Sequence, residues 1–199
     1  MTHRLVIGIT GASGSLYARK MLQVLSAMPG ELHLIVSNMG RQVLAHEMQI
    51  PELGIGGFVR SLAEGSSPAA DIVIHDNYDM FEPVASGSFK TSGMVIIPCS
   101  MKTLSAVATG YSHDLISRAA DVTLKEKRPL VLVTRETPLS LVHLKNMCAA
   151  AEAGATVMPA SPGFYNHPQS IDDLVEYMVG RVLDHLNIES PGMARWGDV

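Results

Sequence analysis

A glycine-rich turn near the start of the chain is the first feature that could do chemistry. Residues 8–14 read Gly-Ile-Thr-Gly-Ala-Ser-Gly, which has GxxGxxG spacing and lacks both the GxGxxG pattern and the Lys-Ser/Thr ending of a P-loop. Small residues let the backbone approach a ligand, and the helix expected after the turn would present unpaired N–H groups to an anion. The turn therefore favours a phosphate or flavin contact, with a tight structural turn as the alternative.

The end of the second predicted strand indicates which nucleotide would fit. A dinucleotide site would place Asp or Glu there to hold the ribose diol, but this chain has Ser37 and Asn38. A neutral hydroxyl suits a phosphate or a ribityl chain better. The sequence therefore favours a mononucleotide such as FMN over NAD.

Two further polar turns follow predicted strands. Residues 100–103, Ser-Met-Lys-Thr, offer two hydroxyls, a cation and helix N-terminal amides, which suit a phosphate or a flavin ring edge. The alternative is a Ser N-cap beside a solvated Lys. Arg135 and Glu136 place a guanidinium beside a carboxylate, and the two could pair with each other or take part in catalysis. A turn at Thr137-Pro138 would let both side chains face one ligand.

The elements that must position these turns alternate between strands and helices. Apolar runs predict strands at 5–9, 32–36, 93–98, 130–134 and 156–158, and helical spacing predicts helices at 16–27, 41–47, after 103, at 139–151 and at 171–186. Such a pattern is typical of a doubly wound parallel α/β sheet, a Rossmann-like or flavodoxin-like three-layer sandwich. Ligands in these folds bind beyond the carboxyl ends of the strands, where the polar turns stand.

The domain organisation is predicted to be a single flavoprotein domain over 1–199. Residues 51–70 are rich in Gly, Ser and Pro, so we interpret them as loop with one short helix, and as the place where a second domain could join. The segment from about 187 to 199 is expected to reach over the active site or a neighbouring subunit.

The composition excludes several classes of protein. Lys plus Arg number 15 against 19 Asp plus Glu, giving 15 − 19 = −4, and no basic run exceeds two residues, so we expect neither nucleic acid nor a membrane as partner. With 47% apolar and 17% charged residues, much of the surface is expected to be covered by other subunits. The two cysteines lack CxxC spacing, which fits a cytoplasmic location. No apolar run reaches the length of about 18 residues that a membrane span needs.

A metal site and a serine-hydrolase site are not expected. The stretch that begins His46-Glu47 resembles a zincin helix but has Ile50 where the second His must stand. No G-x-S-x-G elbow occurs, since Ser15 follows Gly14.

Several motifs together resemble one known family. They are the turn at 8–14, Ser-Gly-Ser-Phe at 86–89, Pro-Cys-Ser-Met-Lys-Thr at 98–103, Arg-Ala-Ala-Asp-Val at 118–122 with Lys-Glu at 125–126, Arg-Glu-Thr-Pro-Leu at 135–139, Pro-Gly-Phe-Tyr at 162–165 and Arg-Val-Leu-Asp at 181–184. The chain resembles the UbiX-type flavin prenyltransferases, formerly called aromatic acid decarboxylase small subunits, from about residue 4 to Trp196.

The resemblance implies a reaction and a substrate. Members of the family join a dimethylallyl group, delivered as its phosphate or diphosphate, to N5 and C6 of reduced FMN, which gives the prenylated cofactor of UbiD-type decarboxylases. It also implies a homo-oligomer, the dodecamer of the family, and no metal. The FMN-binding residues implied are Gly11, Ala12, Ser13, Ser37, Ser100, Met101, Lys102, Thr103 and Arg135.

The resemblance also implies a site for the prenyl phosphate, with some residues contributed across subunit contacts. Tyr165 and Trp196 would stabilise the allylic cation, and Glu136 would protonate or orient the departing phosphate. Ser13 would act on the proton at N5 of the flavin. The residues implied to bind dimethylallyl phosphate are Ser86, Arg118, Lys125, Glu136, Tyr165 and Arg181, and those implied to be catalytic are Ser13, Glu136, Lys125, Tyr165 and Trp196.

One segment departs from the family pattern, and two other functions stay open. Residues 78–85 read Tyr-Asp-Met-Phe-Glu-Pro-Val-Ala where members often have small apolar residues, which would alter a wall near the prenyl pocket. The alternatives are a non-catalytic protein that binds and delivers FMN or prenylated FMN, and a flavin-dependent cysteine decarboxylase. The latter would carry Pro-Ala-Ser-Ala-Asn-Thr in place of the motif at 98–103.

Overall fold

The computed structural model describes residues 3–49, 54–62 and 69–189. Trp196, predicted to stabilise the allylic cation, lies outside the described residues. So does most of the segment 187–199, predicted to reach over the active site or a neighbouring subunit. No helix in the described ranges is long and apolar enough to cross a lipid bilayer.

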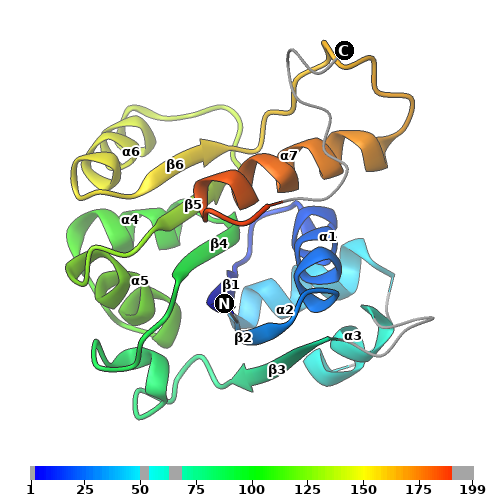
Figure 1. The fold of residues 1–199 in the computed structure, drawn as a ribbon. Coiled ribbons are helices and arrows are strands. Elements are labelled where there is room, and N and C mark those ends of the chain that lie inside the picture. Colours follow the sequence, from blue (N-terminus) through cyan, green and yellow to red (C-terminus); the bar gives the residue numbers. More distant parts are fainter. Residues whose placement is uncertain (1–2, 50–53, 63–68, 190–199) are drawn as a thin grey trace.

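A six-stranded parallel sheet forms the middle layer (Figure 1). Its strands, in the spatial order β3-β2-β1-β4-β5-β6, are β3 (Ala70–His75), β2 (Gly30–Val36), β1 (His3–Ile9), β4 (Gly93–Cys99), β5 (Leu130–Thr134) and β6 (Thr156–Pro159). The order reverses between β1 and β4, which is the switch point where doubly wound sheets bind ligands. The predicted fold class is confirmed.

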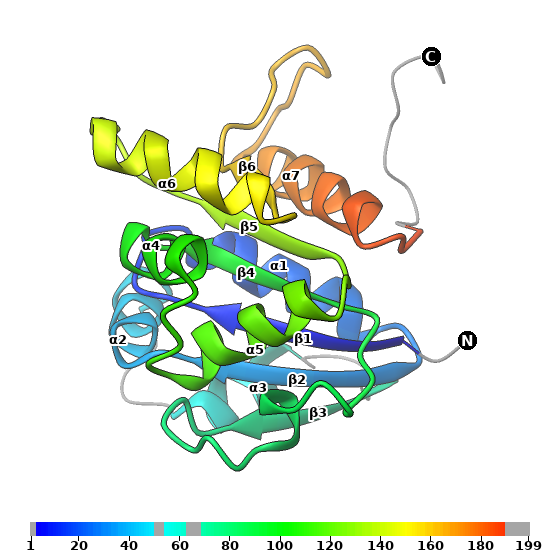
Figure 2. The same ribbon diagram turned by 90° about the vertical axis from the view of Figure 1, so that its left-hand side faces the viewer.

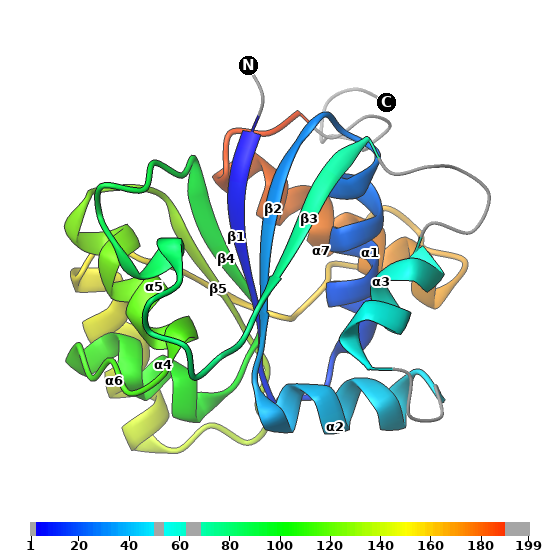
Figure 3. The same cartoon turned by 90° about the horizontal axis from the view of Figure 1, so that it is seen from below.

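Helices cover both faces of the sheet (Figures 2 and 3). One face carries α1 (Ser15–Ser26), α3 (Ile55–Leu62) and α7 (Ile171–His185), and the other carries α4 (Met101–Thr109), α5 (Leu115–Lys125) and α6 (Leu141–Glu152). The remaining elements are α2 (Asn38–Glu47), which follows β2, and the short 3-10 helix η1 (Pro83–Ala85).

The alternation of side chains along the strands divides the core into two. In β1, Leu5, Ile7 and Ile9 pack into the cluster that includes residues of α1 and α7. Val6 points the other way, into the cluster beneath α4 and α5. Strands β4 and β5 are buried along their whole length, so both faces of the sheet centre are closed to water and the turns beyond the strand ends are where a ligand could enter.

Three elements were not predicted from the sequence: β3, α5 and the short helix η1. Strand β3 lies at the edge of the sheet, with a half-exposed burial pattern, and its short apolar run is flanked by Asp71 and His75, so it lacks the signal of the buried strands. Helix α5 was not separated from α4 in the sequence. Strand β5 and the short helix within 51–70 are confirmed, and the other predicted elements differ from the observed bounds by a few residues at their ends.

Candidate functional site

Thr10 joins the turn after β1 to the turn after β4. Its Oγ1 donates to the carbonyl of Pro98 at 2.8 Å and accepts from the amide of Ser100 at 2.8 Å. The side chain is buried, so these bonds are shielded from water. The clamp fixes the glycine turn against the Ser-Met-Lys-Thr turn, a role that the sequence analysis missed.

A cavity of about 240 Å³ opens at this switch point. Five of its lining residues were predicted to bind FMN, and they come from three separate strand ends: Gly11, Ser37, Ser100, Lys102 and Thr103. The others were not predicted to bind FMN, although Tyr78 opens the segment expected near the prenyl pocket: Asn38, Met39, Asn77, Tyr78 and Asp114. Asn77 and Tyr78 follow β3, so missing that strand meant missing this wall.

Two helix N-termini meet at the cavity. Ser37 caps α2 by accepting from the Gly40 amide at 3.0 Å, and Ser100 caps α4 by accepting from the Thr103 amide at 3.4 Å. Both the binding and the capping interpretation of Ser100 therefore fit its position. With Lys102 beside two helix N-termini, the cavity is suited to an anion such as the phosphate of FMN.

Gly11 is needed because the chain passes close to α2. A Cβ built at Gly11 would lie 2.5 Å from the Cβ of Met39, closer than real Cβ contacts. Any side chain there would push the turn away from α2. The absence of a Cβ thus sets one wall of the cavity.

The amides at the start of α1 are already occupied, which corrects one expectation. The carboxylate of Glu47, at the end of α2, accepts from the Gly14 amide at 3.0 Å and from the Ser15 amide at 2.8 Å. Partial burial alone would raise the pKa of Glu47, but hydrogen bonds from Ser13, Ser15 and Gly14 lower it to about 2. The anion at this helix N-terminus is the protein's own carboxylate, because α2 returns its last turn to the glycine loop.

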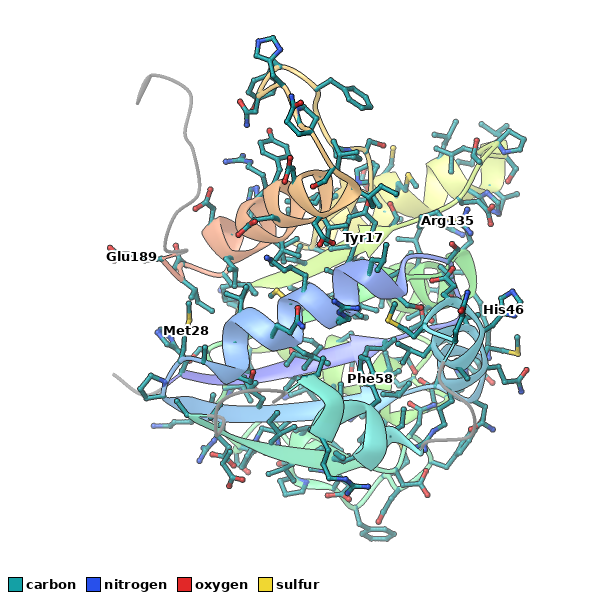
Figure 4. All side chains as sticks on the ribbon, turned by 90° about the vertical axis from the view of Figure 1, so that its right-hand side faces the viewer. Tyr17, Met28, His46, Phe58, Arg135 and Glu189 are labelled. Carbon is teal, nitrogen blue, oxygen red and sulfur yellow. The ribbon has the colours of Figure 1, made fainter. Side chains whose placement is uncertain are left out.

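A second cavity, of about 430 Å³, also borders the glycine turn. It has a mostly apolar lining with a few polar groups, made by Ser13, Gly14, Leu16, Tyr17, His46, Glu47, Ile171, Leu174 and Val175. Figure 4 shows His46 and Arg135 toward one end of the molecule and Met28 and Glu189 toward the opposite end, with Tyr17 between them. The glycine turn thus lines both cavities, with Gly11 at the first and Ser13 and Gly14 at the second.

Arg135 and Glu136 each hydrogen-bond to a different partner. Arg135 Nε donates to the carbonyl of Ser13 at 3.2 Å, which brings the end of β5 to the glycine turn. The Glu136 carboxylate accepts from the amide of Thr137 at 3.0 Å. Arg135 therefore reaches the predicted flavin site, while Glu136 stays exposed on the turn.

Three of the residues predicted to bind the donor phosphate lie together on the α5 side of the sheet. Arg118 Nε donates to the carbonyl of Ala85 at 3.1 Å, next to Ser86. Lys125 Nζ, on the same helix, lies 2.5 Å from Glu126, and a Cβ added to Gly87 would meet both side chains. Ser86, Arg118 and Lys125 thus form one polar surface.

Two others lie on the opposite layer. Tyr165 precedes α7, and its hydroxyl is 2.5 Å from that of Tyr177, with the rings packed edge to face. This hydrogen bond raises the pKa of Tyr177. Arg181 on α7 pairs with Asp184 at 3.1 Å. Because the sheet separates α5 from α7, one chain does not bring all of the predicted donor residues together (Figure 3).

The described residues contain no group of three or more His, Cys, Asp or Glu side chains that could hold a metal ion. The spacing after His46-Glu47 predicts no zinc site there. In the structure Glu47 is engaged by backbone amides instead.

Known proteins match the chain along nearly its whole length. A family model described as Flavoprotein matches residues 1–183. The flavin prenyltransferase UbiX of Escherichia coli K12 is 48% identical over 196 residues, covering 97% of each chain. The UbiX of Deinococcus radiodurans is 46% identical over 198 residues, covering 97% of this chain and 93% of the relative. The chain belongs to the UbiX flavin prenyltransferase family.

Solved structures of UbiX proteins agree. AnUbiX (PadA1), crystallised with FMN and dimethylallyl pyrophosphate, superposes with a TM-score of 0.89 at 42% identity and full coverage of both chains. A dodecameric FMN-dependent UbiX-like decarboxylase from E. coli O157:H7 gives 0.86 at 43% identity, with 97% and 98% covered. The cysteine decarboxylase TvaF is only 16% identical, so its likeness shows the fold alone.

Proposed function

We propose that this protein joins a dimethylallyl group to N5 and C6 of reduced FMN, and so makes the prenylated flavin used by UbiD-type decarboxylases. The observation that carries the proposal is the full-length likeness to AnUbiX, whose structure contains both FMN and dimethylallyl pyrophosphate. The cavity at the switch point, with two helix N-termini and Lys102, adds a place for the FMN phosphate.

We assign the FMN contacts to the turns that surround the first cavity. Ser37, Ser100, Met101, Lys102 and Thr103 would hold the phosphate end through hydroxyls, helix amides and one ammonium group. Gly11, Ala12 and Ser13 would lie along the nucleotide, and Arg135 would contact it from the end of β5, since its guanidinium already reaches the Ser13 carbonyl. The reduced flavin supplies the nucleophilic ring atoms when it is bound.

The donor phosphate is assigned to cations and a phenol from two subunits. The bond from phosphate to the allylic carbon breaks with carbocation character, so Lys125, Arg118 and Arg181 would neutralise the charge that builds on the departing phosphate. The face of Tyr165 would stabilise the cation without capturing it. Ser86 would complete the phosphate contacts, and Glu136 would orient or protonate the leaving group. Trp196 keeps the proposed cation-stabilising role, outside the described residues.

A homo-oligomer, with the dodecamer as the proposed state, would complete this divided site. In α6, Leu141 is 66% exposed and Val142 is 64% exposed, although the helix is mainly apolar. An apolar helix face open to water is characteristic of a subunit interface. A cytoplasmic location is also proposed, because Cys148 is an exposed free thiol and Cys99 a buried one.

The test is direct. Purified protein and reduced FMN are incubated without oxygen, with dimethylallyl phosphate or the diphosphate in separate reactions. The mass of the released flavin is then measured by mass spectrometry. We expect a flavin heavier by one prenyl unit with at least one donor. FMN binding without prenylation by either donor would favour the carrier alternative, and would direct attention to Phe81, which is 99% exposed.

A further inference from the structure

Two stacked histidines are buried between β2 and β3. His33 is 3% exposed and His75 is 2% exposed, and the rings are stacked with centroids 5.0 Å apart. His33 Nδ1 lies 2.7 Å from His75 Nε2, which is hydrogen-bond distance. Neither residue belongs to the flavin or donor contacts assigned above.

A carboxylate stands at each outer end of the pair. His33 Nε2 lies 3.0 Å from Glu31 Oε1, and His75 Nδ1 lies 2.7 Å from Glu82 Oε2. Both are ion-pair contacts by distance, although neither meets hydrogen-bond angles. Arg4 Nε from β1 balances the Glu31 carboxylate at 2.6 Å, and the ring of Phe89 packs edge-on against His33.

The contacts link the segment after β3 to the sheet. Glu82 Oε2 lies against His75 Nδ1, His75 Nε2 lies against His33 Nδ1, and His33 Nε2 lies against Glu31 Oε1. Burial lowers the pKa of His33, because a charge on that ring would be shielded from water. Since both rings are buried, this row of contacts fixes the Glu82 carboxylate relative to β2 and β3.

Glu82 begins the segment that carries part of the donor site. The Glu82 carbonyl accepts from the Ala85 amide at 3.0 Å, which forms the turn of η1. The Ala85 carbonyl then accepts from Arg118 Nε at 3.1 Å, and Ser86 follows directly. Farther along, Gly87 is held by Arg128 at 2.8 Å. Tethering Glu82 to β3 through His75 thus fixes the start of the segment on which Ser86 and Arg118 depend.

We propose that the His33–His75 pair is a positioning device for the donor phosphate, holding Glu82 so that Ser86 and Arg118 are preset to bind the phosphate of the prenyl donor. The proposal rests on the function proposed above. The charged groups that face the pair are Glu31 on β2, Arg4 on β1 and Glu82 ahead of η1. Arg118 reaches the same segment from α5.

The experiment measures donor KM, kcat and FMN affinity in Glu82→Gln, His75→Gln and the double variant, with His185→Gln on the exposed end of α7 as the control. Glu82→Gln leaves the buried His75 ring without its carboxylate partner, and His75→Gln leaves the half-buried Glu82 carboxylate without its imidazole partner. We expect donor KM to rise about 10-fold, with kcat at saturating donor and the FMN Kd within about twofold of wild type. In the double variant both members of the contact are gone, so its KM should lie below the product of the single effects.

The outcomes separate this inference from the proposed function. Wild type that binds FMN but prenylates with no donor overturns the proposed function, and this inference with it. Active wild type with unchanged donor KM in Glu82→Gln overturns the positioning role alone. A parallel loss of FMN affinity, or strictly multiplicative single effects, also overturns it, because either would indicate general damage to the fold. Since Glu82 is half-buried, its variant remains informative should His75→Gln fail to fold.

Discussion

Replacing Glu47 by Gln would test whether a carboxylate at the start of α1 stabilises the glycine turn. Oε2 accepts from the amides of Gly14 at 3.0 Å and Ser15 at 2.8 Å, and Oε1 accepts a longer bond from Gly14 at 3.3 Å. A Gln side chain keeps one accepting oxygen, and its NH₂ group would face the Gly14 amide in the place of Oε1. The substitution removes the negative charge from a helix N-terminus and sets one donor against another.

The expected cost follows from the pKa of Glu47, which lies at about 2 instead of 4.5. At full weight such a lowering corresponds to roughly 3 kcal/mol. Because Glu47 is only partly buried, solvent screening reduces this figure, and we expect about 1 to 2 kcal/mol. For a domain of this size the melting temperature should fall by about 2 to 8 °C.

The pH dependence gives the sharper test. A group whose pKa is lowered by folding contributes stability that is fully present above its ordinary pKa and is lost as the pH falls toward the folded value. The deficit of Glu47→Gln should therefore be full at pH 7 and shrink between pH 4.5 and about 2. Thermal unfolding is measured without FMN across this range, with the exposed Glu152→Gln as control. An equal deficit at every pH, or an equal one in the control, would refute the reasoning.

Three further outcomes are expected. Arg135→Ala should weaken FMN binding about 10-fold to 150-fold in a flavin titration, while Arg19→Ala should not, since only Arg135 reaches the Ser13 carbonyl. Arg181→Ala should slow single-turnover prenylation by at least about 100-fold and leave FMN affinity nearly unchanged. Inactive variants of Ser13 and Arg118 should regain some activity once their subunits are exchanged. No recovery after verified exchange would place both residues in one chain's site.

Residues at the ends of parallel strands were predictable as a group because the topology brings those ends to one edge. Gly11, Ser37 and Ser100 are far apart in the sequence, yet they line one cavity. Their small or hydroxylated side chains indicated the ligand class before any geometry was known. The prediction was possible because an apolar strand followed by a polar turn is a local sequence signal. The parallel sheet then places the turns after its strands close together at one edge.

Contacts between residues of different helices, strands and turns were not predictable in the same way. Glu47 ends α2, and nothing in its local sequence indicates that its carboxylate occupies the amides of Gly14 and Ser15. Likewise, His33 and His75 become partners only because β2 and β3 are adjacent, and β3 was not predicted. In both cases the interaction depends on tertiary placement, which residue spacing does not encode.

The arrangement of the donor residues has a consequence for where activity resides. Arg118 and Lys125 on α5 and Arg181 on α7 lie on opposite sides of a sheet whose central strands are buried throughout. No side-chain motion within one chain can bring them to a common phosphate, since each would have to pass the sheet edge. If they act on one donor, as proposed, each site must join the α5 layer of one subunit to the α7 layer of another. Conditions that dissociate the oligomer should then abolish prenylation while leaving each chain's FMN cavity formed.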